Sequence, residues 1–183
     1  MLSLDLGDGL ALAPLEPWQA DEFAAFVDAE RDFLEPWLPF AVFIKDADSS
    51  ARFLQRYADN TALDGYRIWC LRQDGTMVGG TLFKEFDPKH GVCEVGVWLA
   101  EDAQGKGAVT RAVTAMLDWA VGVRGIRRVE WRCAPENTAS RNVAQRLGMT
   151  LEGRLREAFV HDGRQQDMEI WALLGPEWAQ RSL

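Results

Sequence analysis

Two glycines in a short loop, followed by an amphipathic helix, form the stretch of this chain best suited to hold an anion. The stretch runs from Cys93 to Met116 and reads CEVGVWLAEDAQGKGAVTRAVTAM. Apolar residues alternate with others at its start, which predicts a strand at residues 92–99. The loop Gln104–Gly107 then leads into residues 109–120, whose apolar residues recur at helical spacing. Glycines let backbone N–H groups converge and a helix N-terminus adds its positive dipole end, so the sequence predicts a seat for a phosphate or pyrophosphate.

The cysteines and histidines do not form a pattern typical of a metal site. Cys70, Cys93 and Cys133 are odd in number and widely spaced, which favours free thiols over disulfides. His90 and His161 stand far apart, and no Cys/His group has metal-ligand spacing. We therefore expect no metal.

Length and charge narrow the classes of function. The 183 residues, 48% of them hydrophobic, are enough for one domain over 1–183 with a substantial core. The net charge of −8 argues against a nucleic-acid surface and permits a basic amine or peptide as substrate, although solubility explains it equally well. No apolar run reaches the ~20 residues of a membrane span, and the N-terminus lacks a signal-peptide pattern. We expect a cytoplasmic protein without a membrane partner.

The elements that must position the loop are both strands and helices. An aromatic stretch, RDFLEPWLPF, is broken by Pro36 and Pro39 and serves either as a hydrophobic plug or as a wall of a substrate pocket. The other predicted elements are a strand at 10–15, a helix at 18–27, a helix capped by Asp48 and Ser49, a hairpin of 66–72 and 77–85, a strand at 92–99, a helix from 109, a strand at 129–133, a short helix beginning near Ser140, and a hairpin of 150–160 and 165–174. This order indicates one mixed α/β domain.

With these motifs in place, the chain resembles the GNAT-fold N-acetyltransferases, and among them the RimL/RimJ-like branch that acetylates protein N-terminal amines. The resemblance covers nearly the whole chain and is strongest in EVGVWL followed by QGKGAVTRAV, in RRVEWRCAPENTASRNVAQRLGMTLEG and in the C-terminal hairpin. It implies an α+β GNAT fold: a mixed, mostly antiparallel sheet of six to seven strands, flanked by about four helices, with splayed central strands that hold acetyl-CoA. It also implies an amine acceptor, which in this branch is the N-terminus of a ribosomal or other protein, and a homodimer by analogy.

The resemblance assigns the donor site residue by residue. The pyrophosphate would be surrounded by Gln104, Gly105, Lys106, Gly107, Ala108, Val109 and Thr110. Val109 departs from the small residue that the family favours there, but its N–H remains. Trp98 and Leu99 occupy the end of the strand along which the pantetheine arm would lie, and a backbone N–H near them would meet the oxyanion. Asn137 resembles the asparagine that holds the cofactor arm, and helix capping is its alternative role.

Acetyl transfer to an amine needs a base, an oxyanion site and a proton donor to the leaving thiolate. Ser140 matches the serine assigned to the thiolate, with helix capping as the alternative. Glu94 lies on the strand leading into the cofactor site and is the preferred base, with a solvated or salt-bridged role as the alternative. Related enzymes can carry a glutamate at the position that Phe159 occupies in this chain. The side chain of Phe159 cannot accept a proton. Glu157, expected on the same strand face, is a second candidate beside water.

The remaining polar groups have plain interpretations. His161 is expected to be an exposed turn residue, and Cys133 to be part of the strand core. Asp167 and Glu169 either line the acceptor site or lie on a solvated outer face. Three functions stay open at this point: an acetyltransferase of a protein N-terminus, an acetyltransferase of a small amine, polyamine or antibiotic, and a non-catalytic acyl-CoA-binding module.

Overall fold

The computed structural model describes residues 3–161 and 163–181. Contacts within the chain divide it into two compact units. The first unit comprises the chain up to Leu82 together with Val97–Ala112, and the second comprises Phe83–Gly96 together with the chain from Val113 onward. Strands β4 (Thr76–Asp87) and β5 (Val92–Leu99) and helix α5 (Ala108–Leu117) each run from one unit into the other.

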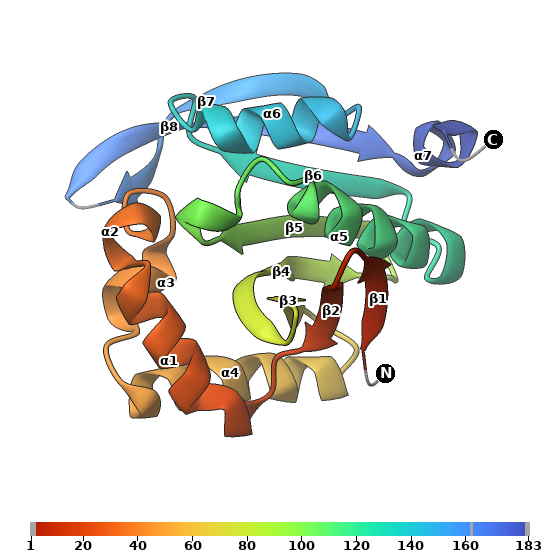
Figure 1. Cartoon of the computed structure of the whole chain (residues 1–183). Helices are drawn as coiled ribbons and strands as arrows, with labels where there is room; N and C mark the ends of the chain where they lie inside the picture. The colour runs from red at the N-terminus through yellow and green to blue at the C-terminus, as the bar shows by residue number, and fades with distance from the viewer. Residues whose placement is uncertain (1–2, 162, 182–183) are drawn as a thin grey trace. The chain divides into compact units, whose positions relative to one another are not determined.

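The first unit contains strands in the order β1-β2-β3-β4 and a set of helices, labelled in Figure 1. Its strands pair antiparallel in β1–β2 and β2–β3. Its remaining elements are β1 (Leu4–Gly7), β2 (Leu10–Pro14), η1 (Pro17–Gln19), α1 (Ala20–Ala29), α2 (Arg31–Leu34), α3 (Pro39–Phe43), α4 (Ala47–Ala62), β3 (Arg67–Gln73) and η2 (Glu101–Ala103).

Local sequence explains most of these boundaries. Pro36 and Pro39 confine the aromatic segment to the short helices α2 and α3, as predicted. Helix α4 begins at a capping box in which Asp46 accepts from the Ser49 N–H and the Ser49 hydroxyl accepts from the Asp46 N–H. The prediction that Asp48 and Ser49 cap this helix was therefore right for Ser49 and wrong for Asp48, because Asp46 is the N-cap and Asp48 lies within the first turn.

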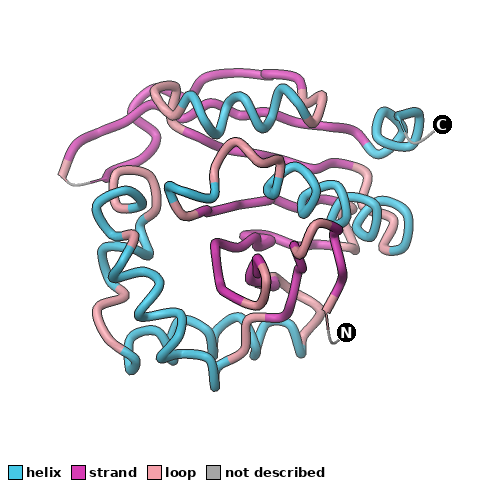
Figure 2. The backbone as a smooth tube through the Cα atoms, viewed as in Figure 1, coloured by secondary structure: helices cyan, strands magenta, loops and turns pink. Residues whose placement is uncertain are grey.

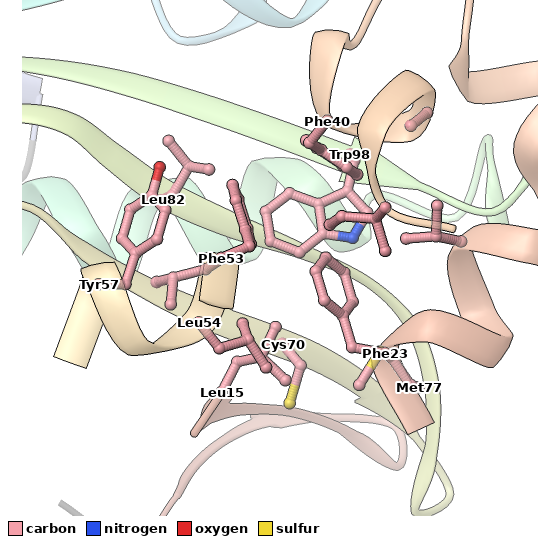
Figure 3. Packing of buried hydrophobic residues seen from close by; sticks show 14 of the residues in the cluster. Leu15, Phe23, Phe40, Phe53, Leu54, Tyr57, Cys70, Met77, Leu82 and Trp98 are labelled. Carbon is pink, nitrogen blue, oxygen red and sulfur yellow. The ribbon is translucent and has the colours of Figure 1, made fainter. Parts of the chain in front are cut away.

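An aromatic cluster forms the core of the first unit. Phe23 and Phe40 pack against the indole of Trp98, with ring centroids 5.9 and 5.5 Å away (Figure 3). A Cβ atom at Gly80 would collide with that indole and with the carbonyl oxygen of Trp69. A glycine at position 80 is thus what allows Trp98 to enter the core.

The second unit contains strands in the order β5-β6-β8-β7, which form a mixed sheet. Figure 2 draws the strands in magenta and the helices in cyan. The β5–β6 ladder is parallel and runs from Val92–Arg128 to Val95–Trp131, whereas β8 pairs antiparallel with β6 and with β7. The remaining elements of this unit are the π-helix η3 (Asp118–Val123), β6 (Arg128–Cys133), α6 (Thr138–Arg146), β7 (Thr150–His161), β8 (Arg164–Leu174) and α7 (Gly175–Arg181).

The described chain has more elements than the sequence predicted. It contains eight strands instead of six to seven and seven α-helices instead of about four. The first strand was missed because β1 has only four, mostly exposed residues, and α7 because it begins at a Gly-Pro pair that also suits a turn. The mixed, mostly antiparallel sheet is confirmed. Within the described residues, no helix has the length and apolar character needed to span a membrane.

Candidate active site

Both glycines of the loop adopt a left-handed backbone conformation, which favours glycine. Gly105 and Gly107 adopt φ values of 76° and 77°. A Cβ atom at either position would meet nothing within 4 Å, so backbone conformation rather than space calls for glycine. The loop is exposed and opens on the first turn of α5, whose leading N–H groups have no partner within the helix. The predicted pyrophosphate residues from Gln104 to Thr110 all lie in the first unit, with residues 104–107 exposed and Ala108 buried.

The two predicted residues at the end of β5 lie in the same unit as the loop. The side chain of Trp98 is only 3% exposed and belongs to the aromatic core. Its indole Nε1 has no hydrogen-bond partner among the residues that the structure describes. The Trp98 side chain is thus turned into the core, and Leu99 is half-buried beside it.

An acidic pocket in the first unit adjoins the aromatic segment. It has a volume of about 440 Å³. Its lining residues are Ala29, Glu30, Asp32, Phe33, Glu101 and Asp102. Within the aromatic segment, Phe40 is buried in the core and Phe33 lines this pocket.

Asn137 and Ser140 lie together at the start of α6 in the second unit. Asn137 is the N-cap, and its Oδ1 accepts the backbone N–H of Ser140 at 2.9 Å. The capping role considered for Asn137 is thereby confirmed. Ser140 is not the cap. Its Oγ instead accepts a hydrogen bond from the indole Nε1 of Trp131 at 2.8 Å.

Glu94 is a buried, salt-bridged strand residue. Its side chain is 8% exposed, with Oε1 2.9 Å from Lys84 Nζ and Oε2 3.6 Å from Arg132 Nε. The parallel register sets Glu94 opposite Glu130, and Arg132 Nη2 lies 2.8 Å from the Glu130 carboxylate. Arg132 is thus shared between two facing carboxylates, which would otherwise repel each other.

Glu130 continues this chain of charges on the same unit. Arg128 contacts both Glu130 and Glu152, at 2.8 and 2.6 Å. Burial works against the charged form of Glu130, but hydrogen bonds from Arg128 and Arg132 outweigh it, so the pKa of Glu130 lies below its ordinary value. The result is an alternating row of basic and acidic groups from Lys84 to Glu152.

The C-terminal hairpin departs from simple strand alternation. The pairing shifts between Leu155 and Phe159, and Glu157 within this bulge adopts φ 51°. Alternation therefore does not place Glu157 and Phe159 on one face, as the sequence predicted. The Glu157 N–H donates to Asp167. That bond, opposed by partial desolvation and aided by Arg154, holds the pKa of Asp167 below its ordinary value.

One further prediction for this hairpin, for His161, was wrong, and one of the two alternatives for Glu169 is excluded. His161 is not an exposed turn residue: it ends β7, is 7% exposed and stacks on the ring of Phe159, whereas the adjoining Asp162 lies outside the described residues. Glu169 is not on a solvated face, because its carboxylate is buried and accepts hydrogen bonds from Arg141 and Trp171, each at 3.0 Å. Alternation alone does not reveal which strand face a helix covers.

The cysteines are buried and unpaired. Burial raises the pKa of Cys93 to about 12, and neighbouring Glu130 and Glu94 add to the shift. Cys133 is strand core, as predicted. Among the residues that the structure describes, there is no group of three or more His, Cys, Asp or Glu side chains that could hold a metal ion.

The geometry agrees with the result of a family comparison. A profile described as "Acetyltransferase (GNAT) domain" matches residues 10–150. The chain belongs to the GNAT acetyltransferase family. Membership identifies it as an N-acetyltransferase, and the predicted GNAT fold is confirmed.

Relatives of this GNAT chain share its length. It is 26% identical to the Bacillus subtilis (strain 168) protein named "Putative ribosomal N-acetyltransferase YdaF", over 97% of this chain and 98% of that protein. It is also 26% identical to the ribosomal-protein-serine acetyltransferase of Escherichia coli (strain K12), over 78% and 79% of the two chains.

Solved structures show the same fold. A RimL ribosomal L7/L12 alpha-N-protein acetyltransferase in complex with coenzyme A superposes with a TM-score of 0.88 at 22% identity, covering 94% of this chain and 97% of that chain. The microcin C7 self-immunity acetyltransferase MccE, in complex with acetyl-CoA and AMP, gives a TM-score of 0.86 at 23% identity, covering 92% and 94%.

Proposed function

We propose that this GNAT enzyme is a single domain that transfers the acetyl group of acetyl-CoA to the N-terminal α-amine of a protein, of the ribosomal-protein type. The observation that supports the donor is the loop of two left-handed glycines that opens on the N-terminus of α5. Such a loop presents several N–H groups and the positive helix end to a pyrophosphate. The names of the full-length relatives support the acceptor class.

The residues of the loop would hold acetyl-CoA mainly through the backbone. Gln104, Gly105, Lys106 and Gly107 are exposed, and Ala108, Val109 and Thr110 begin the helix. The N–H groups at 108–110 face no intrahelical acceptor. The Thr110 hydroxyl and the Lys106 ammonium are available to add a hydrogen bond and positive charge. The main chain of Trp98 and Leu99 would pair with the amide-rich arm and stabilise the oxyanion.

The chemistry would be direct attack by the amine. Its nitrogen bonds to the thioester carbon, the C–S bond breaks, and the sulfur takes the bonding electron pair. Ser140 would donate a hydrogen bond to that sulfur, and Asn137 would bind the cofactor arm as well as cap α6. Glu94 would accept the proton that the amine loses, either directly or through water, and the thiol product carries the equivalent proton away. Because Lys84 and Arg132 already bind the Glu94 carboxylate, Glu157 and water stay as alternative acceptors of the proton.

The acidic pocket is our candidate for the place where the acceptor ammonium first binds. Four of its six lining residues are carboxylates. An acidic pocket attracts an N-terminal ammonium and the basic residues that follow it in many peptides. Ribosomal proteins are made in the cytoplasm, so an acceptor of this kind would place the enzyme there, without a nucleic-acid or membrane partner and, by analogy, as a homodimer.

The alternative is an acetyltransferase of a small amine, polyamine or antibiotic, because one fold can carry different acceptor sites. A non-catalytic acyl-CoA-binding module is the further alternative.

The test measures free-thiol release from acetyl-CoA against a matched acceptor panel. The panel contains peptides that begin with serine or alanine, the same peptides with a blocked N-terminus and one internal lysine, polyamines and small amines. Release only with free N-termini supports the proposal, and release only with small amines supports the alternative. Tight acetyl-CoA binding without thiol release in the presence of any acceptor would support the non-catalytic acyl-CoA-binding module.

A further inference from the structure

Trp131 is a core residue whose single polar atom points at a proposed reactive group. It lies on β6, is 2% exposed and is among the largest fully buried side chains. The β6 register places it between Val95 on one side and Trp171 on the other. Its indole Nε1 reaches Ser140 Oγ at 2.8 Å, across from β6 to the first turn of α6.

The direction of this hydrogen bond is fixed by chemistry. An indole N–H can only donate, so Ser140 Oγ must accept with one of its lone pairs. The hydroxyl hydrogen of Ser140 therefore cannot point at Trp131 and must be directed elsewhere. Two other buried tryptophans, Trp171 and Trp178, donate instead to the carboxylates of Glu169 and Asp118.

The backbone of Ser140 is held as well. Its N–H donates to Asn137 Oδ1 at 2.9 Å, so both the main chain and the side chain are anchored. Ser140 is nevertheless only half-buried.

The thiol of Cys133 lies two residues beyond Trp131 on β6. Burial raises the pKa of this thiol, so Cys133 stays neutral and does not act as a competing anion.

We propose that Trp131 is a positioning residue, whose indole N–H holds Ser140 Oγ so that the hydroxyl donates to the sulfur of the departing CoA thiolate. The inference rests on the proposed function. As the C–S bond breaks, the sulfur takes the electron pair and the Ser140 O–H points at it. The indole N–H withdraws electron density from Oγ, which strengthens the hydroxyl as a donor. Trp131 itself exchanges no proton.

The test is a double-mutant cycle in the thiol-release assay. Trp131→Phe keeps an aromatic ring and removes the N–H. We expect it to lower kcat about five- to tenfold, as for the loss of one hydrogen bond, with the KM for acetyl-CoA within about twofold of wild type. In a Ser140→Ala background the same substitution should change kcat less than about twofold, because its target is gone.

Trp178→Phe is the matched control, since it removes another buried indole N–H from the same unit. It should lower thermal stability and leave kcat near the wild-type value. Trp131→His is a second variant, tested outside the cycle: its smaller ring retains an N–H donor, so it should keep kcat above that of Ser140→Ala even if Trp131→Phe does not fold. A kcat as low as that of Ser140→Ala would contradict the inference.

The outcomes separate the inference from the function on which it rests. An active wild type with an unchanged Trp131→Phe, or with effects that multiply in the double variant, would overturn the inference alone. A wild type that releases no thiol with any acceptor would overturn the proposed function and the role of Trp131 together.

Discussion

Lys84 Nζ lies 2.9 Å from Glu94 Oε1, so an ammonium that is half-exposed is bound to a carboxylate that is almost fully buried. The exposed fractions of the two side chains are 52% and 8%. Glu94 is therefore held in place by groups of its own unit before any substrate arrives. To accept a proton from the substrate ammonium, the Glu94 carboxylate must first give up a contact with Lys84 or Arg132.

The first prediction distinguishes the proposed role of Glu94 as the base from its role in the ion pair with Lys84. Glu94→Gln should lower kcat about 100-fold, the size typical of a lost general base, with little change in the KM for acetyl-CoA. Lys84→Met keeps the carboxylate and should instead lower the free energy of unfolding by about 1–2 kcal/mol, since Arg132 remains as a partner. Steady-state kinetics and urea unfolding measure the two effects. Wild-type kcat in Glu94→Gln would exclude Glu94 as the base.

The second prediction concerns the two roles of Asn137. Asn137→Ala should cost about 1 kcal/mol of stability through the lost cap and should also raise the KM for acetyl-CoA. Asn137→Asp keeps an acceptor for the Ser140 N–H and loses the amide donor, so it should restore the stability but not the KM. If Asn137→Asp restores both, Asn137 acts only as a cap.

The third prediction concerns the left-handed glycines of the loop. Gly107→Ala should raise the KM for acetyl-CoA at least about tenfold, because a Cβ at φ 77° costs about 1–2 kcal/mol and turns the N–H groups away from the anion. Gly125→Ala is the control: its φ is 69° and the space around it is open. It should lose similar stability with an unchanged KM. Equal KM values in both variants would argue against a pyrophosphate site at this loop.

The fourth prediction follows from the depressed pKa of Glu130, whose ordinary value is 4.5. Because the pKa is lower in the folded chain, the stabilisation is present above 4.5 and is lost as the pH falls through the lower folded pKa. Between about pH 5 and pH 3, wild type should therefore lose about 1 kcal/mol more stability than Glu130→Gln. Urea midpoints at several pH values measure the difference, and parallel curves would contradict it.

Sequence reasoning predicted the features that depend on neighbouring residues. The Asp-Gly turn fixed the β3–β4 hairpin, and Pro36 and Pro39 limited α2 and α3. The glycines of the loop were identified because their backbone requirement is local. For α4, two aspartates compete as caps, and a capping box between Asp46 and Ser49 is the signal that decides between them.

Features that depend on packing could not be predicted in this way. Nothing in the sequence pairs Trp131 with Ser140, because their contact requires α6 to lie against β6. Likewise, the burial of Glu169 depends on Arg141 and Trp171, which arrive from a helix and from two residues further along the strand. The bulge at Glu157 interrupts the strand alternation, and the prediction that Glu157 and Phe159 share one strand face relied on that alternation.

Because Gly80 and Trp98 are in close contact, a substitution at one of these two distant positions limits which residues the other position can tolerate. A larger residue at position 80 collides with the indole and with a main-chain oxygen on β3. Such a change should be tolerated only together with a smaller side chain at position 98, and even then only if β3 shifts. The two positions should therefore behave as mutual suppressors in a random-mutagenesis screen, and selection for activity should recover them together more often than singly.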